Sequence, residues 1–176
     1  MANGILIQSA VMAKDVDSLN RAVVAAVDVQ NGSVLNLTGY STDAGEGEVW
    51  SAEAPATATL TSLWMAYSPE VVVTDGKYKG LDVDTRNFVN TSGEVFDAFK
   101  PQIGDIVTMT ADAIGGTKST NTFIVATDGE LKLQWAAAAV SGLSLSLVDE
   151  TTVSIGTGAI GTHKVAAYKF EVVAIA

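Results

Sequence analysis

The chain has no cysteine and a single histidine among its 176 residues. The missing thiols exclude disulfide bonds, thiolate metal sites and cysteine nucleophiles. Basic residues are scarce as well, because 10 Lys and Arg stand against 20 Asp and Glu, which gives a formal net charge of −10. These basic residues are scattered singly and form no patch for a phosphate backbone or an anionic lipid surface. We therefore expect no nucleic-acid partner and no membrane partner.

Long hydrophobic runs are also missing. No apolar stretch approaches the roughly 20 residues that a bilayer-spanning helix needs. The first residues, MANGILIQSAVMAKD, place no basic segment before their short apolar stretch, so we expect no secretion signal. Hydrophobic residues still make up 48% of the chain and charged residues only 17%. This composition predicts one globular domain with a surface rich in Ser, Thr, Gly and Ala.

What the chain does contain is the period-two alternation that is typical of β-strands. It recurs in residues 24–39, 130–135, 142–156 and 164–176. Asn31-Gly32 predicts a hairpin within the first segment, because Asn-Gly readily adopts positive φ angles. Asp128-Gly129 predicts a second hairpin with the segment NTFIVAT, and Asp149 to Thr151 predicts a turn inside the third segment. About nine to eleven strands are expected, in an all-β antiparallel β-sandwich or barrel.

Helical periodicity is confined to short stretches. Residues 15–27 fit both a helix and a strand, and we expect a strand with at most one helical turn before it. DTRNF (residues 84–88) and EVFDAF (residues 94–99) have the composition for one short helical turn each. Residues 1–20 precede the first clear strand and are interpreted as an N-terminal arm or an edge segment. Residues 21–176 are interpreted as a single β domain.

Residues with catalytic potential do not form a known constellation. His163 could act as a catalytic base, but the chain has no Gly-x-Ser-x-Gly motif to supply a serine nucleophile, and a lone histidine is more often a surface residue. Asp15 with Asp17, and Asp82 with Asp84, have the spacing to share a cation on an extended strand, but the further oxygen donors of a calcium loop are missing. Residues 115–120, GGTKST, lack the spacing of a phosphate loop. We therefore expect no enzymatic activity, no metal site and no cofactor.

Exposed aromatic rings would indicate a carbohydrate-binding module. Trp135 continues an apolar stripe, and Trp64 lies in the dense apolar segment LWMAY, so both are predicted in the core. Trp50 is the one tryptophan expected at the surface, and one ring is too little for a sugar platform. A glycan- or receptor-binding β module, with Trp50 or Tyr40 as its contact, stays open as an alternative.

A Pro-x-x-Gly-Asp turn, Pro101 to Asp105, begins the apolar run of residues 106–110. In this turn the carboxylate of Asp105 can accept hydrogen bonds from loop amides. Apolar side chains occupy both faces of the run. We therefore predict a strand that is buried on both sides or covered by a neighbouring subunit.

Three stretches of the chain carry a resemblance to a known class of proteins. VDVQNGSVLNL, YKGLDVDTRNFVNTSGEVFDAFKPQIGDIVTMTADAIGG and GELKLQW resemble small virion proteins of tailed bacteriophages, similar to capsid decoration (cement) proteins. The matching features are the Asn-Gly turn after an Ala/Val run, RNFVN before a Gly turn, and the strand start GDIVTMT. They span most of residues 20–135.

The resemblance implies a non-enzymatic structural protein of the phage virion. Such a protein binds the major capsid protein on the outer shell and stabilises the shell against the pressure of packaged DNA. It also implies a homo-oligomer, as a trimer or another symmetric cluster, that is made in the host cytoplasm and resides on the capsid surface. Another virion component, such as a tail tube or head–tail joining protein, stays open as an alternative.

No contact motif of those proteins matches this chain position by position. Position in the chain instead indicates two segments for capsid or subunit contact, the N-terminal arm and the loop from Arg86 to Asn90. The contact residues predicted in them are Ile5, Ile7, Val11, Met12, Arg86, Asn87, Phe88 and Asn90.

Overall fold

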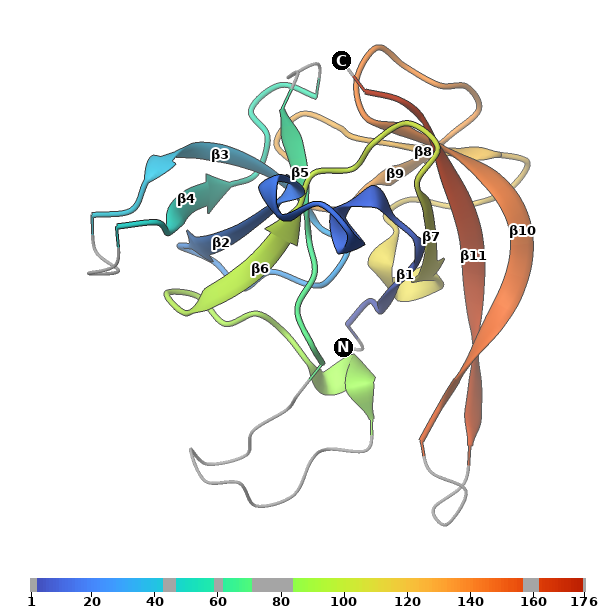
Figure 1. The fold of residues 1–176 in the computed structure, drawn as a ribbon. Coiled ribbons are helices and arrows are strands. Elements are labelled where there is room, and N and C mark those ends of the chain that lie inside the picture. Colours follow the sequence, from blue (N-terminus) through green and yellow to red (C-terminus); the bar gives the residue numbers. More distant parts are fainter. Residues whose placement is uncertain (1–2, 43–46, 59–61, 71–83, 157–161, 176) are drawn as a thin grey trace.

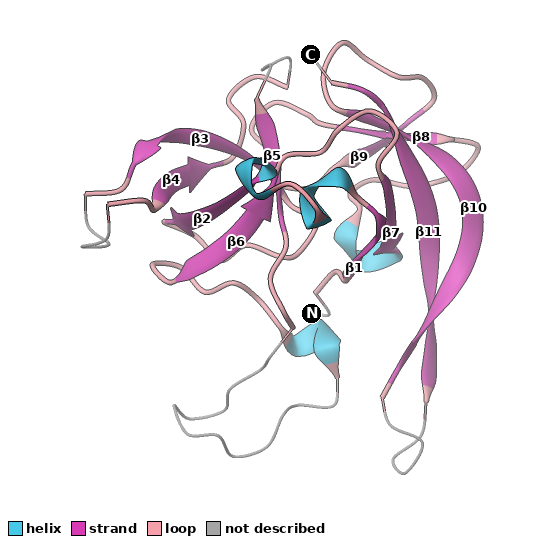
Figure 2. Ribbon diagram, viewed as in Figure 1, coloured by secondary structure: helices cyan, strands magenta, loops and turns pink. Residues whose placement is uncertain are grey.

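The computed structural model describes residues 3–42, 47–58, 62–70, 84–156 and 162–175. Within these residues the regular structure consists of eleven strands and four short 3-10 turns (Figures 1 and 2), which confirms the all-β prediction. The strands are β1 (Leu6–Ala10), β2 (Asn20–Ala25), β3 (Val34–Tyr40), β4 (Trp50–Glu53), β5 (Leu63–Ala66), β6 (Val95–Phe99), β7 (Ile106–Thr110), β8 (Phe123–Val125), β9 (Gln134–Ala136), β10 (Ser144–Ile155) and β11 (His163–Ala174). The 3-10 turns are η1 (Met12–Lys14), η2 (Asp17–Leu19), η3 (Thr85–Asn87) and η4 (Ala111–Ala113). Among the described residues no helix is long and apolar enough to cross a membrane.

The strands form two sheets that pack on each other. The larger sheet has the order β1-β7-β11-β10-β8-β9, and the smaller one closes into a barrel with the order β2-β4-β3-β5-β6. Neighbouring strands are antiparallel except β2 and β4, which run parallel. Figure 1 shows the barrel strands on the left and the larger sheet on the right.

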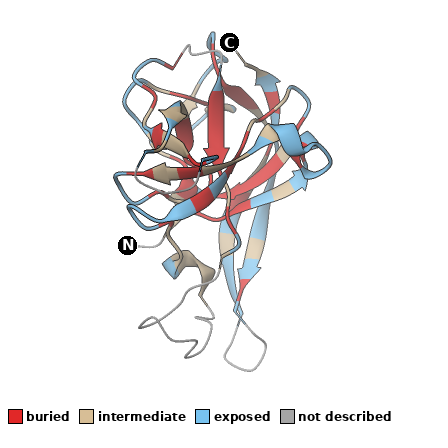
Figure 3. Cartoon of the chain, turned by 60° about the vertical axis from the view of Figure 1, so that its left-hand side comes forward, coloured by how far each residue is buried: buried red, intermediate tan, exposed pale blue. Residues whose placement is uncertain are grey.

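Two hydrophobic clusters follow from the alternation along the barrel strands. On β3, Val34 belongs to the cluster that also contains Val107 and Phe170 of the larger sheet. The next residue, Leu35, belongs to a second cluster formed by barrel residues such as Phe96. The barrel strands therefore fill their own interior with one face and pack against the larger sheet with the other. The buried residues in Figure 3 occupy these two zones.

The prediction of a β2–β3 hairpin at Asn31-Gly32 is wrong. The turn itself exists, since the Ser33 N–H donates to the Gln30 carbonyl at 3.1 Å and Gly32 has a φ of 87°. The strands on either side do not pair, because β4 lies between them in the barrel. Tertiary contacts fix the connection instead: Val29 forms an isolated bridge with Asn90.

Two further local predictions are corrected. The segment EVFDAF forms strand β6 rather than a helical turn, because it pairs with β2 on one side and β5 on the other. Asp149 to Thr151 form no turn, since β10 continues through them to Ile155 with a register shift between Leu147 and Asp149. A bulge of this kind bends a strand without ending it, which a local polar cluster cannot reveal.

Other local predictions are confirmed. The Asp128-Gly129 turn lies between the paired strands β8 and β9. Residues 84–88 contain η3, and η2 is the one helical turn directly before β2. Strand β7 lies between β1 and β11, and Val107, Thr108, Met109 and Thr110 are all buried within the chain.

The β10–β11 hairpin extends beyond the body of the protein (Figures 1 and 3). Strand β7 pairs with β11 over Ala167–Glu171, and β8 pairs with β10 over Ser144–Ser146. Among the described residues, Thr152–Ile155 and His163–Ala166 pair only with each other. These two segments are called the ribbon below.

Candidate functional site

Asp105 organises the corner at which β7 begins. Its Oδ2 accepts from the Gln102 N–H at 2.8 Å and its Oδ1 from the Met12 N–H at 2.9 Å. The side chain is buried, with 4% of the residue exposed. The prediction that this carboxylate accepts hydrogen bonds from loop amides is confirmed. The structure adds that one of its two donors, the Met12 N–H, belongs to the N-terminal segment.

Three exposed apolar residues are connected to Asp105 through the backbone. Met12 is bound directly to its carboxylate, and Ile103 is two residues before it. Val173 follows Val172, whose backbone N–H donates to the Asp105 carbonyl at 2.9 Å. Met12 is 52% exposed, Ile103 62% and Val173 38%. We call Met12, Ile103 and Val173 the Asp105 corner. Large apolar side chains that water surrounds at one corner are typical of a contact surface.

The N-terminal contact residues predicted from the sequence divide into two groups. Ile5 and Val11 are buried in the chain, at 4% and 6% exposure. Ile7 and Met12 point to solvent, at 41% and 52% exposure. Strand β1 forms an edge of the larger sheet, and its backbone is partly covered because the Lys14 ammonium donates to the Gln8 carbonyl.

The loop from Arg86 to Asn90 is held by interactions within the chain. Arg86 forms a two-pronged ion pair with Asp84, with Nη2 at 2.7 Å from Oδ2 and Nε at 2.9 Å from Oδ1. The hydrogen bond from Arg86 holds the pKa of the Asp84 carboxyl below its ordinary value. Asp84 also caps η3 through the Arg86 N–H. Arg86 and Phe88 are half-buried, and Asn87 is exposed.

Asn90, at the end of this loop, belongs to a buried polar network. Its Nδ2 donates to the Val29 carbonyl at 2.9 Å and to Asn31 Oδ1 at 3.3 Å. Asn31 in turn exchanges two hydrogen bonds with the backbone of Ser68, at 2.9 and 3.0 Å. Since this network fixes three connections of the barrel, Asn90 has a structural role, and its side chain is not at the surface.

Glu70 lies beside this network. Burial raises the pKa of the Glu70 carboxyl, and its hydrogen bond with the Asn31 side chain opposes that rise. Glu70, whose pKa is raised, therefore lies next to the buried side-chain amides of Asn31 and Asn90.

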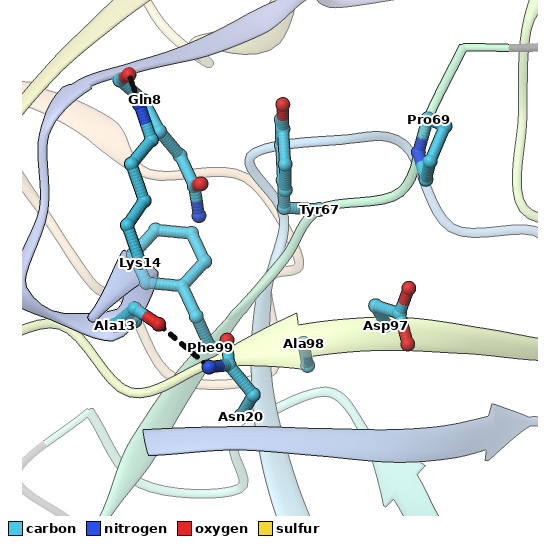
Figure 4. A pocket seen from close by; sticks show the side chains of 9 residues that line it. All are labelled: Gln8, Ala13, Lys14, Asn20, Tyr67, Pro69, Asp97, Ala98 and Phe99. Carbon is cyan, nitrogen blue, oxygen red and sulfur yellow. Dashed lines mark hydrogen bonds between the residues drawn. The ribbon is translucent and has the colours of Figure 1, made fainter. Parts of the chain in front are cut away.

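A pocket of about 340 Å³ separates the N-terminal segment from the barrel (Figure 4). Phe99 lies at its base, and the Tyr67 ring meets Phe99 edge-on at 6.5 Å. Lys14 donates to the Gln8 carbonyl, and the Asn20 Nδ2 donates to the Ala13 carbonyl at 2.7 Å. These two polar side chains are thus bound to the backbone, and the other polar side chains that line the pocket are Gln8, Tyr67 and Asp97.

Among the residues tested for catalysis and metal binding, His163 and Asp84 lie near each other, since His163 adds a minor lowering of the Asp84 pKa to the larger one from Arg86. His163 is exposed at the start of β11, and Asp15 and Asp17 are exposed around η1 and η2. Asp82 lies outside the described residues. No group of three or more His, Asp or Glu within reach of one metal ion occurs in the described part of the chain.

The tryptophans also differ in their surroundings. Trp64 is buried, and the Arg21 guanidinium lies 5.4 Å from the centroid of its ring. Trp135 is half-buried against Tyr168 and Phe170. Trp50 packs partly on the barrel core and meets Tyr40 on the neighbouring strand, at 4.5 Å between ring centroids. From the sequence, Trp50 was interpreted as an isolated surface ring, and its contact with Tyr40 was not predicted.

No family model, no curated protein and no solved structure matches this chain.

Proposed function

We propose that the chain is a non-enzymatic structural protein of a tailed-phage virion, and that it binds the outer capsid shell as a decoration protein. The ribbon is the observation that carries this proposal. Among the described residues no further strand pairs with either edge of the ribbon, and an isolated two-stranded ribbon is marginally stable in water. A neighbouring protein that covers the ribbon would stabilise it and would gain binding area.

The composition of the ribbon favours burial against another protein. One strand contributes Thr152, Val153, Ser154 and Ile155, of which Ile155 is already buried within the chain, and the other contributes His163, Lys164, Val165 and Ala166. Lys164 is the only residue of the eight with a permanent charge, so the desolvation cost of covering the ribbon is small. A projecting strand pair of this kind suits the symmetric contacts of a shell, where the same segment is covered at every position.

The Asp105 corner supplies a second contact. Fully burying a side chain of the size of Ile103 or Met12 contributes about 1.5–3 kcal/mol. The buried Asp105 carboxylate binds the backbone N–H groups of Met12 and of Gln102, the residue before Ile103. The backbone at both contact residues is therefore already ordered, and binding a partner costs little conformational entropy there. The ribbon and the corner together support attachment at two points to the major capsid protein or to a second copy of this chain.

The direct test is to mix the purified protein with capsids that lack it. We expect saturable binding with a fixed number of copies per capsid, and a higher melting temperature of the shell. Electron microscopy of the same capsids should show added density on the outer surface. Density along the tail or at the neck would instead assign the chain to the tail tube or head–tail joining proteins. If the protein binds no capsid of the phage that encodes it, the proposal is refuted.

Two substitutions test the contact surfaces. Thr152→Lys places an ammonium group on the ribbon, and Thr120→Lys adds the same charge in an exposed loop as a matched control. Since an unpaired charge that loses its water costs several kcal/mol, we expect capsid binding of Thr152→Lys to weaken at least about tenfold. Ile103→Ser should weaken binding about tenfold, whereas Val140→Ser, in another loop, should not. Equal affinities for the substitutions and their controls would remove the ribbon and the corner from the contact.

A further inference from the structure

A second pocket, of about 420 Å³, opens at one end of the barrel. Its walls include the Tyr40 and Trp50 rings and four polar residues, Asp17, Asn20, Arg21 and Glu48. We call it the Tyr40–Trp50 pocket. It contains no residue of the Asp105 corner or of the ribbon.

Strand pairing brings the parts of this pocket together. Tyr40, the last residue of β3, is the antiparallel partner of Trp50, the first residue of β4. Trp50 is also opposite Val23 of β2, which runs parallel to β4. The start of β4 therefore meets the end of β3, the first residues of β2 extend past the start of β4, and the three strands are neighbours in Figure 1. This is why Asn20 and Arg21, which begin β2, line the same pocket as the two aromatic rings.

The two rings form a fixed aromatic surface. Their planes are tilted by 39°, and their centroids are 4.5 Å apart, so each ring lies against the other. Trp50 is half-buried on the barrel core, whereas Tyr40 is 62% exposed. The packed Trp50 thus holds Tyr40 in place while most of the tyrosine surface stays in water. An exposed aromatic ring on a rigid strand can bind a ligand with little loss of conformational freedom.

The polar groups around the rings are mainly hydrogen-bond acceptors. Asp17 and Glu48 are exposed, and the ion pairs among the described residues, Arg86–Asp84 and Lys118–Glu150, involve neither of them. One nitrogen of Arg21 is already engaged, because its Nη1 donates to the carbonyls of Ser18 and Asn20 at 3.1 and 2.7 Å. The pocket therefore offers two carboxyl groups whose oxygens can accept from hydroxyl groups.

We propose that the Tyr40–Trp50 pocket binds a neutral pyranose sugar. A pyranose has an apolar C–H face that can stack on an aromatic ring and a rim of hydroxyl donors. Tyr40 with Trp50 matches the face, and Asp17 with Glu48 matches the rim. The volume is sufficient for one sugar ring at the lower end of the usual range for ligand sites.

The geometry disfavours other ligands of similar size. A cation needs rings arranged around it as a cage, whereas these two rings pack on each other. An acidic sugar or a nucleotide would meet two carboxylates in a chain of net charge −10. A neutral sugar avoids both conflicts.

The test follows the indole N–H of Trp50 by NMR in the full-length protein labelled with 15N. The signal is assigned with Trp50→Phe, and the probes are methyl glycosides of glucose, galactose and N-acetylglucosamine. We expect at least one of them to shift this signal saturably with a Kd of about 1–10 mM, as befits one shallow site. Removing the ring with Tyr40→Ala should weaken binding about tenfold, whereas Tyr40→Phe should keep most of it. Asp17→Asn and Glu48→Gln should each weaken binding about three- to tenfold.

Val95→Ala is the matched control, because Val95 is an exposed side chain of the barrel outside this pocket. It should leave the Kd unchanged. The proposal is wrong if no neutral glycoside shifts the signal up to about 100 mM, a concentration far above the Kd of even a weak site. It is also wrong if Tyr40→Ala, with an unchanged fold by circular dichroism, still binds as well, or if choline or N-acetylneuraminate binds more tightly than the neutral glycosides. None of these measurements involves capsids, so their outcome is independent of the proposed attachment to the shell.

Discussion

Replacing Asp105 by Ala should lower the stability of the whole protein, although the residue is in a turn. The carboxylate accepts two backbone N–H groups, from Met12 at 2.9 Å and from Gln102 at 2.8 Å. A hydrogen bond to a charged group contributes about 1.5–3 kcal/mol when its partner is buried. Met12 and Gln102 are partly reached by water, so we take the lower value for each bond. Their sum is about 3 kcal/mol.

For a chain of this length, 1 kcal/mol corresponds to about 2–4 °C in Tm. We therefore expect Asp105→Ala to lower Tm by about 8 °C in scanning calorimetry. Asp105→Asn retains one acceptor oxygen and turns an N–H₂ group towards the other backbone donor. It should lose at least one of the two bonds and lower Tm by about 4 °C or more.

Asp15→Ala is the matched control for this experiment. It removes the same negative charge from a chain of net charge −10, but the Asp15 side chain is exposed and accepts no hydrogen bond within the described residues. We expect its Tm to stay within about 1 °C of the parent. If Asp105→Ala and Asp15→Ala differ by less than about 2 °C, the carboxylate does not hold the N-terminal segment to the β7 corner as we infer.

Three further substitutions test other parts of the structure by urea unfolding. A Cβ at Gly4 would lie 2.3 Å from the Cα of Ala113, so Gly4→Ala should lower the free energy of unfolding by about 2–3 kcal/mol. Gly47→Ala is the control and should be nearly neutral, because no atom lies within 4 Å of a Cβ there. Equal losses of stability in the two variants would contradict this packing. Because the pKa of Glu70 is raised, the folded protein holds the Glu70 proton more tightly than the unfolded chain does. The stability of the protein therefore falls as the pH rises from 4.5, the ordinary pKa of a Glu carboxyl, through the pKa in the folded state. Glu70→Gln should therefore gain more stability at pH 7 than at pH 4, and a constant difference would show that burial does not act on this acid. Asn31→Asp replaces a buried amide donor by a charge beside Glu70 and should cost about 3 kcal/mol, clearly more at pH 7 than at pH 4.

Several predictions that depend on short-range physics agree with the structure, but the helical turn in EVFDAF and the turn at Asp149 to Thr151 do not. Alternation identified the strands, because a half-buried strand needs apolar residues on one face whatever its partner is. The role of Asp105 was also predictable, because an acid after Gly104 in a turn has amide donors nearby. Burial of β7 on both sides was predictable from its apolar and Thr side chains. What could not be predicted was that the second donor for Asp105 is Met12, which lies 93 positions away.

Strand pairing is where sequence reasoning failed, because it depends on contacts between distant segments. Asn31-Gly32 has the residues of a hairpin turn, yet Asn31 is held by Ser68, and β4 separates the strands that the turn connects. Local turn chemistry sets the bend but not the partners.

The Tyr40–Trp50 pair is a case in which the information was present but was not used. Ten positions separate the two residues, with Gly45 and Gly47 between them, and each ends or begins a strand. Had residues 34–53 been interpreted as a hairpin, its symmetry would have placed the two rings opposite each other. Strand β2 would still have been missing from the pocket, because its parallel pairing with β4 has no signature in either segment. The aromatic half of the proposed sugar site was therefore accessible from the sequence, whereas the placement of Asp17, which precedes β2, beside the two rings required the fold.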